Sequence, residues 1–91
     1  ALLKYLDSSK EEARISGLEQ YTEKQLFFFN YAFSWCSKQR LEASIYQILN
    51  DNHSPPEARV NVVLGNLPEF SDAFQCPLGS PMNPIKKCRV W

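Results

Sequence analysis

The sequence of 91 residues predicts a mainly α-helical chain that is part of a larger protein. Three observations carry this prediction: helix-start signals recur along the chain, one helix is apolar nearly all round, and three cysteines cannot all pair with one another. A helix without a polar face must be covered on several sides, and a chain this short has little left to cover it. The length fits one domain and excludes a separate second domain.

Charge and composition exclude several classes of partner. Ten Lys and Arg balance ten Asp and Glu, so no basic surplus exists to neutralise nucleic-acid phosphates. Apolar residues make up 44% of the sequence, which is too hydrophobic for a disordered chain. The most apolar stretch, Leu26 to Cys36, is too short for a membrane span, which needs about 20 residues. We expect a folded segment without a nucleic-acid partner or a membrane span.

The first residues indicate an excerpt or a processed chain. The sequence begins at Ala1 and has neither the basic nor the apolar region of a signal peptide. The apolar positions near the start predict the last turns of a helix that begins upstream, and these positions are Leu2, Leu3, Tyr5 and Leu6. Residues 7–12 are then expected to form a loop or a short solvated helix.

A capping box predicts the start of the next helix, over residues 23–36. The Thr22 hydroxyl can accept from the backbone N–H of Gln25, whose side chain returns to the backbone of Thr22. Only Asn30 and Ser34 interrupt the apolar surface of this aromatic helix.

An amphipathic helix is expected over residues 39–50. Its apolar residues follow the spacing of one helical face, and they are Leu41, Ile45, Ile48 and Leu49. We expect that face to pack on the aromatic helix.

Prolines mark the starts of two further helices. In Ser54-Pro55-Pro56-Glu57, the serine is expected to be the N-cap and Pro55 the first helical residue. A buried stripe should follow, formed by Val60, Val63, Leu64 and Leu67. The sequence Asn66-Leu67-Pro68-Glu69 predicts another short helix through Phe74. After Gln75, prolines and a glycine exclude regular structure.

His53 and Arg59 are the residues with the clearest chemical potential. His53, the one histidine, precedes a helix N-terminus, whose positive end favours a neutral ring able to donate to an oxyanion. Arg59 lies in the second turn of that helix, where its guanidinium could grip a carbonyl or carboxylate in the same cleft. An ordinary surface or capping histidine and a solvated arginine are the alternatives.

The remaining candidates support no independent active site. A residue such as Trp35 lies more often in a core than in a pocket, and Ser34 and Ser54 lack the partners of a serine hydrolase. The spacing of Cys36, Cys76 and Cys88 argues against a closed zinc site, and half-cystines of an extracellular protein fit better than reactive thiols.

Several motifs together resemble the C-terminus of the neprilysin and endothelin-converting-enzyme family of zinc metalloendopeptidases. They extend from Gln25 to the last residue and occur in the order of that family. The matching segments are Gln25-Leu26-Phe27-Phe28, Tyr31-Ala32, Trp35-Cys36, Asp51-Asn52-His53-Ser54-Pro55, Arg59-Val60-Asn61, Pro68 to Cys76, Pro81-Met82-Asn83-Pro84 and Cys88-Arg89-Val90-Trp91.

The resemblance implies the C-terminal helical portion of a thermolysin-like (gluzincin) catalytic domain within a larger ectodomain. Such an enzyme cleaves peptides on the amino side of hydrophobic residues and is single-pass membrane-anchored or secreted. Its zinc is held by an H-E-x-x-H helix and a later glutamate, and the glutamate of H-E-x-x-H activates water. These groups are expected upstream of this chain, so the 91 residues alone should be inactive.

The resemblance also implies roles for individual residues. His53 matches the histidine that stabilises the oxyanion of the tetrahedral intermediate, and Arg59 matches the arginine that binds a substrate carbonyl. Ser34 and Trp35 match positions that line the pocket for the residue after the cut, although Ser34 replaces a branched apolar residue. Cys36, Cys76 and Cys88 match half-cystines with upstream partners. The alternative is a non-catalytic extracellular helical binding module or a degenerate family member.

Overall fold

A computed structural model describes residues 2, 4–5 and 14–89. This part of the chain contains four helices longer than one turn and no strand, which confirms the mainly α fold class. The helices are α2 (Glu23–Ser34), α3 (Leu41–Asn50), α4 (Pro56–Gly65) and α5 (Pro68–Phe74). Leu2 and Tyr5 are helical, as expected, whereas Leu3, Leu6 and the loop predicted over residues 7–12 lie outside the described residues.

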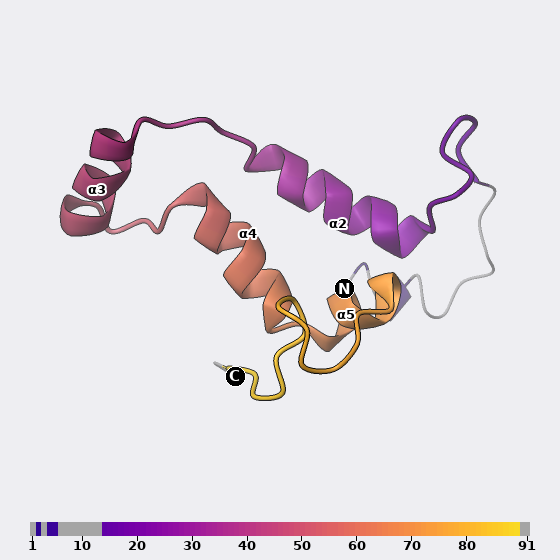
Figure 1. Ribbon diagram of the computed structural model, residues 1–91. Coiled ribbons are helices and arrows are strands. Elements are labelled where there is room, and N and C mark those ends of the chain that lie inside the picture. Colours follow the sequence, from indigo (N-terminus) through magenta and orange to yellow (C-terminus); the bar gives the residue numbers. More distant parts are fainter. Residues whose placement is uncertain (1, 3, 6–13, 90–91) are drawn as a thin grey trace.

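The helices do not gather around one centre. The radius of gyration is 15.7 Å, whereas a compact domain of this length has about 12 Å. Figure 1 shows α3 standing apart at the end of the molecule opposite α5, joined to α2 and α4 by extended segments. No helix in the described ranges is long and apolar enough to cross a membrane.

Aromatic rings between α2 and α5 form the best-covered part of the molecule. Phe28 is only 1% exposed, and its ring meets those of Phe27 and Phe70 edge-on at centroid distances of 5.2 and 5.3 Å. Phe74 completes the cluster against Phe29, at 5.4 Å. Each such aromatic pair contributes about 0.5–1.5 kcal/mol beyond the burial of its apolar area.

The helix α2 begins as the sequence predicts and ends two residues early. Both hydrogen bonds of the capping box between Thr22 and Gln25 are present, at 3.1 Å. At the other end, the N–H groups of Trp35 and Cys36 donate three residues back, to Ala32 and Phe33, so the last turn tightens and the helix stops at Ser34. The aromatic surface is covered on one side, and Phe33 is 79% exposed.

Two details of the proline-led helices differ from expectation. Pro55, not Ser54, is the N-cap of α4, with ψ 151°, because the ring of Pro56 keeps the residue before it out of the helical region. Asn66 ends α4, and α5 starts after Leu67 without a side-chain cap. In the predicted stripe Leu64 is buried, whereas Val63 is 44% exposed because α4 contacts α5 along one side.

The prediction that α3 packs on α2 is wrong. The helix begins at Leu41 rather than at Gln39, and none of its residues is buried. Leu41 is 72% exposed and Leu49 75% exposed, so its apolar face has no cover within the described structure. The connection from Cys36 to Arg40 is extended and carries α3 away from α2 (Figure 1). Amphipathic spacing predicts the face of a helix correctly, but it does not specify the partner of that face.

The segment after α5 is irregular, as predicted, and is fastened to the end of α4. Lys87 Nζ donates to the carbonyl of Gly65 at 3.2 Å and to Asn83 Oδ1 at 2.7 Å. The Asn66 side chain accepts from the backbone N–H of Cys88 at 2.7 Å. An ammonium at the negative end of a helix is favourable, so Lys87 stabilises the α4 terminus while it fixes the tail.

Candidate functional site

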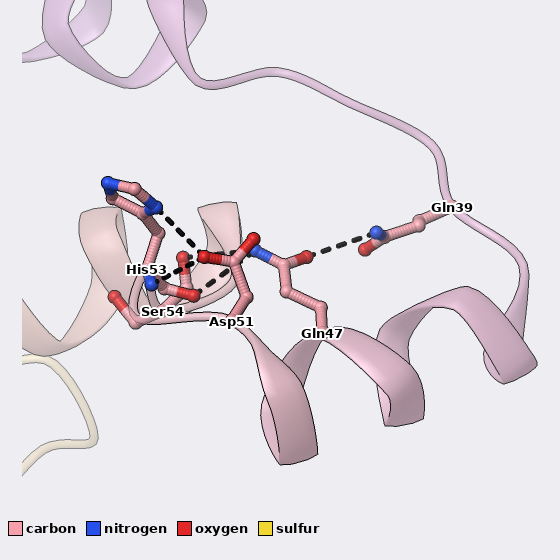
Figure 2. A network of polar contacts seen from close by, with 5 residues as sticks. All are labelled: Gln39, Gln47, Asp51, His53 and Ser54. Carbon is pink, nitrogen blue, oxygen red and sulfur yellow. Dashed lines mark hydrogen bonds and ion pairs between the residues drawn. The ribbon is translucent and has the colours of Figure 1, made fainter.

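His53 lies in the loop between α3 and α4, paired with Asp51. The carboxylate Oδ1 of Asp51 is 2.8 Å from the ring Nδ1 of His53 and 2.8 Å from its backbone nitrogen (Figure 2). The His53 side chain is 70% exposed. The carboxylate therefore fixes both the backbone and the ring of His53 and leaves Nε2 open to a ligand.

The ring of His53 has a second neighbour besides the N-terminus of α4. Asp51 stands two residues before it, and a carboxylate oxygen of Asp51 lies 2.8 Å from Nδ1. The donor and acceptor roles of the two ring nitrogens depend on the tautomer, so the neutral donor expected from the sequence stays a prediction.

The surroundings of Asp51 keep it ionised. Its pKa is lowered chiefly by the hydrogen bond from the backbone N–H of His53 and then by the bond from the His53 ring; burial acts slightly in the opposite direction. The charges of His53 and Arg59 make smaller contributions in the lowering direction. Of the two predicted functional residues, His53 thus contacts Asp51 directly, whereas Arg59 acts on it through its charge.

A chain of side-chain amides supports the His53 loop from α3. Gln47 Nε2 lies 3.3 Å from the carbonyl oxygen of His53 and 3.5 Å from that of Ser54. Gln39 Nε2 donates to Gln47 Oε1 at 3.0 Å, and Ser44 donates to Gln39 at 3.1 Å. Figure 2 shows this chain running from the segment before α3 to the loop. The sequence carries no signal for this chain of contacts, because glutamines on an exposed surface follow no distinctive pattern.

Arg59 is held against Trp35. The guanidinium carbon lies 4.5 Å from the centroid of a Trp35 ring, a cation–π arrangement that joins α4 to the end of α2. The carbonyl of Arg59 accepts from the Tyr31 hydroxyl at 2.8 Å. Two residues that the sequence analysis assigned to substrate contacts, Trp35 and Arg59, thus touch each other.

Ser34 is not part of this contact. Its hydroxyl donates to the Tyr31 carbonyl at 2.7 Å within its own helix, and the residue is exposed. A cleft of about 350 Å³ lies beyond Trp35, where Gln39, Pro55, Pro56 and Glu57 contribute to its wall. Trp35 therefore lines a cleft, whereas Ser34 does not contribute to this one.

Thiols and acidic residues do not form a metal centre in the described ranges. No group of three or more His, Cys, Asp or Glu side chains within residues 2, 4–5 and 14–89 could hold a metal ion. Cys36 and Cys88 are exposed and Cys76 is half-buried, and the three sulfurs form no disulfide with one another. The residues that the structure describes thus do not fit a zinc site of their own.

The chain is thus a helical segment in which His53 is paired with the carboxylate of Asp51 and Arg59 is stacked on Trp35. Comparison with known proteins assigns the segment to a family. The profile of peptidase family M13 matches residues 1–90, and the chain belongs to this family.

Curated relatives agree with this assignment. The chain is 46% identical to Neprilysin-11 of Caenorhabditis elegans over its whole length and 53% identical to Neprilysin-1 of the same organism over 81 residues. It is 46% identical to human neprilysin over 87 residues, which make up 96% of this chain and 12% of that protein. The chain spans only about a tenth of the length of these relatives.

Proposed function

We propose that the complete protein is a zinc-dependent, neprilysin-like endopeptidase that cleaves peptides on the amino side of hydrophobic residues. The observation that carries the proposal is the pair of His53 and Asp51, in a chain that belongs to a peptidase family. A protein that only binds peptides has no need of an oriented histidine that donates to an oxyanion.

In this proposal His53 stabilises the transition state. As water adds to the scissile carbonyl, the oxygen gains negative charge and accepts a hydrogen bond from Nε2–H of His53. Asp51 keeps the His53 ring in one orientation through its 2.8 Å contact with Nδ1, so no reorientation is needed during the reaction. The carboxylate is already charged at neutral pH, since its pKa lies below the usual range.

Arg59 orients the substrate by donating to a backbone carbonyl beside the scissile bond. A guanidinium offers several N–H donors in a fixed plane, and stacking on Trp35 keeps that plane in place. Trp35, together with Ser34, is proposed to line the pocket for the hydrophobic residue after the cut. Ser34 gives that wall a short polar side chain.

The zinc is assigned to residues outside this chain. The 91 residues offer no fitting set of ligands in their described part, so the activation of water belongs to the rest of the protein. We propose the same for the cysteine partners: Cys36, Cys76 and Cys88 pair with upstream cysteines, which suits an extracellular protein, either membrane-anchored or secreted.

The direct test uses the complete protein and peptides with one internal hydrophobic residue. Mass spectrometry of the products should show cleavage on the amino side of that residue. A chelator should abolish the activity and added zinc should restore it. The 91-residue chain alone should be inactive with zinc present. Cleavage by this chain alone, or none by the complete protein with zinc, would overturn the proposal.

A further inference from the structure

Tyr31 and Trp35 both contact Arg59, from neighbouring turns at the end of α2. The two residues are four positions apart, which places them on one side of the helix end. Tyr31 donates its hydroxyl hydrogen to the main-chain carbonyl of Arg59 at 2.8 Å. Trp35 stacks on the guanidinium of the same arginine, 4.5 Å from ring centroid to carbon. One contact holds the backbone and the other holds the end of the side chain.

The hydroxyl bond is not required to complete either helix. Arg59 lies inside α4, where the N–H four residues ahead is the ordinary partner of its carbonyl. A second acceptor site on that oxygen remains available, and Tyr31 uses it across a separation of 28 residues in the sequence. The bond therefore fixes how α4 sits against α2 at the position that carries the arginine.

We propose that Tyr31 is a positioning residue for Arg59, and that with Trp35 it forms a two-point clamp that presents the guanidinium to substrate. This inference rests on the proposed function, in which Arg59 binds a substrate carbonyl. An arginine side chain has many rotamers, and ordering it upon binding reduces affinity. A clamp that orders it beforehand removes part of that cost, which is the effect of preorganisation.

The clamp predicts a specific kinetic signature. Arg59 binds the same carbonyl in the ground state and in the transition state, so its misplacement should raise KM and leave kcat unchanged. A variant that merely lowered the folded fraction would instead reduce apparent kcat at constant KM. These two outcomes separate positioning from general stability.

The experiment measures peptide cleavage by the complete protein with Tyr31→Phe, alone and combined with Arg59→Ala. The Phe variant keeps the ring and removes only the hydroxyl. We expect KM to rise about two- to tenfold, the range for one neutral hydrogen bond, with unchanged kcat. In the Arg59→Ala background, the same substitution should change KM by less than about twofold, because the clamped group is absent. Tyr46→Phe, on exposed α3, is the matched control and should leave both constants unchanged.

Each other result overturns a different statement. If Arg59→Ala alone leaves KM unchanged, the proposed role of Arg59 fails and the clamp fails with it. If Arg59→Ala raises KM but Tyr31→Phe does not, the clamp alone fails. An equal effect of Tyr31→Phe in both backgrounds would show that Tyr31 acts on the fold and not through Arg59. Should Tyr31→Phe lower the melting temperature, Trp35→Phe provides a second variant. Because Trp35 also lines the proposed pocket, its effect on KM must be larger with Arg59 present than in the Arg59→Ala background, and an equal effect in both would overturn the clamp.

Discussion

Around Phe28, helices α2 and α5 are joined by rings in direct contact, whereas the His53 loop is joined to α3 by amides and a carboxylate in solvent. Phe28 is 1% exposed, and the side chain of His53 is 70% exposed. Burial stabilises the first region by removing apolar area from water, so its contribution does not depend on the ionisation of any group. The arrangement of the second region depends instead on the charge of Asp51 and on long hydrogen bonds from the Gln47 amide.

The difference shows that a buried part and an exposed part of so short a chain are held by different interactions. A group that must donate to a substrate has to remain accessible, so it cannot be held by burial. Asp51 and Gln47 hold the His53 loop instead. Asp51 makes two contacts of 2.8 Å with His53, and Gln47 makes longer contacts with the carbonyls of His53 and Ser54. Arg59 lies between the two regions, since its helix α4 contacts α5 while its side chain stacks on Trp35.

The largest expected effect is a loss of stability when the aromatic contact between α2 and α5 is removed. Phe28→Ala in the complete protein should lower the free energy of unfolding by about 3–5 kcal/mol, because the ring leaves a cavity among Phe27, Phe70 and Phe74. Thermal denaturation measures the loss. Phe33→Ala, at a position 79% exposed in this structure, is the matched comparison. A larger loss at Phe33 than at Phe28 would contradict this location of the core.

His53→Ala should leave stability nearly unchanged and reduce kcat about 10²–10³-fold, the range for loss of one oxyanion donor. KM should change little, because the bond forms mainly in the transition state. Steady-state kinetics of the complete protein separate the two constants. Ser54→Ala, on the adjacent exposed residue, should retain full kcat. Equal changes in KM and kcat after His53→Ala would disprove the role.

A smaller effect is expected at the amide chain. Gln47→Ala removes two hydrogen bonds of 3.3 and 3.5 Å to the His53 loop, so kcat should fall only about two- to threefold, with unchanged melting temperature. Gln20→Ala, on an exposed residue of the turn before α2, should not alter kcat. A loss at Gln47 as large as that of His53→Ala would mean that the loop depends on α3 more than on Asp51.

The smallest expected effect is a dependence of stability on pH in the acidic range. The pKa of Asp51 is lowered in the folded state, so its contribution is complete above the unfolded pKa of about 4 and is lost as pH falls through the lower folded value. Melting temperatures of the wild type and Asp51→Asn should therefore differ slightly at pH 6 and converge toward pH 2. Asp72→Asn is the exposed control. A difference that grows in acid would reverse the sign and contradict the geometry.

Features that depend on neighbouring residues were predictable from the sequence. The capping box joins Thr22 and Gln25, three residues apart, and the structure contains both of its bonds. The prolines at the start of α4 and α5 also located those helices, with an error of one residue for α4. The motif around His53 and the resemblance to the peptidase family were also recognisable, because each motif consists of residues that lie close together in the sequence.

The sequence by itself therefore determined the starts of α2 and α5, and within two residues those of α3 and α4. It also determined which residues are candidates for chemistry and the family to which the chain belongs. The tertiary structure decided that α3 stands away from α2, that Asp51 pairs with the ring of His53 and that Tyr31 and Trp35 meet at Arg59. The physical reason is the distance along the sequence over which each interaction acts. A cap or a proline acts through bonds within one turn, whereas the Tyr31 bond crosses 28 residues and exists only after two helices are oriented in space.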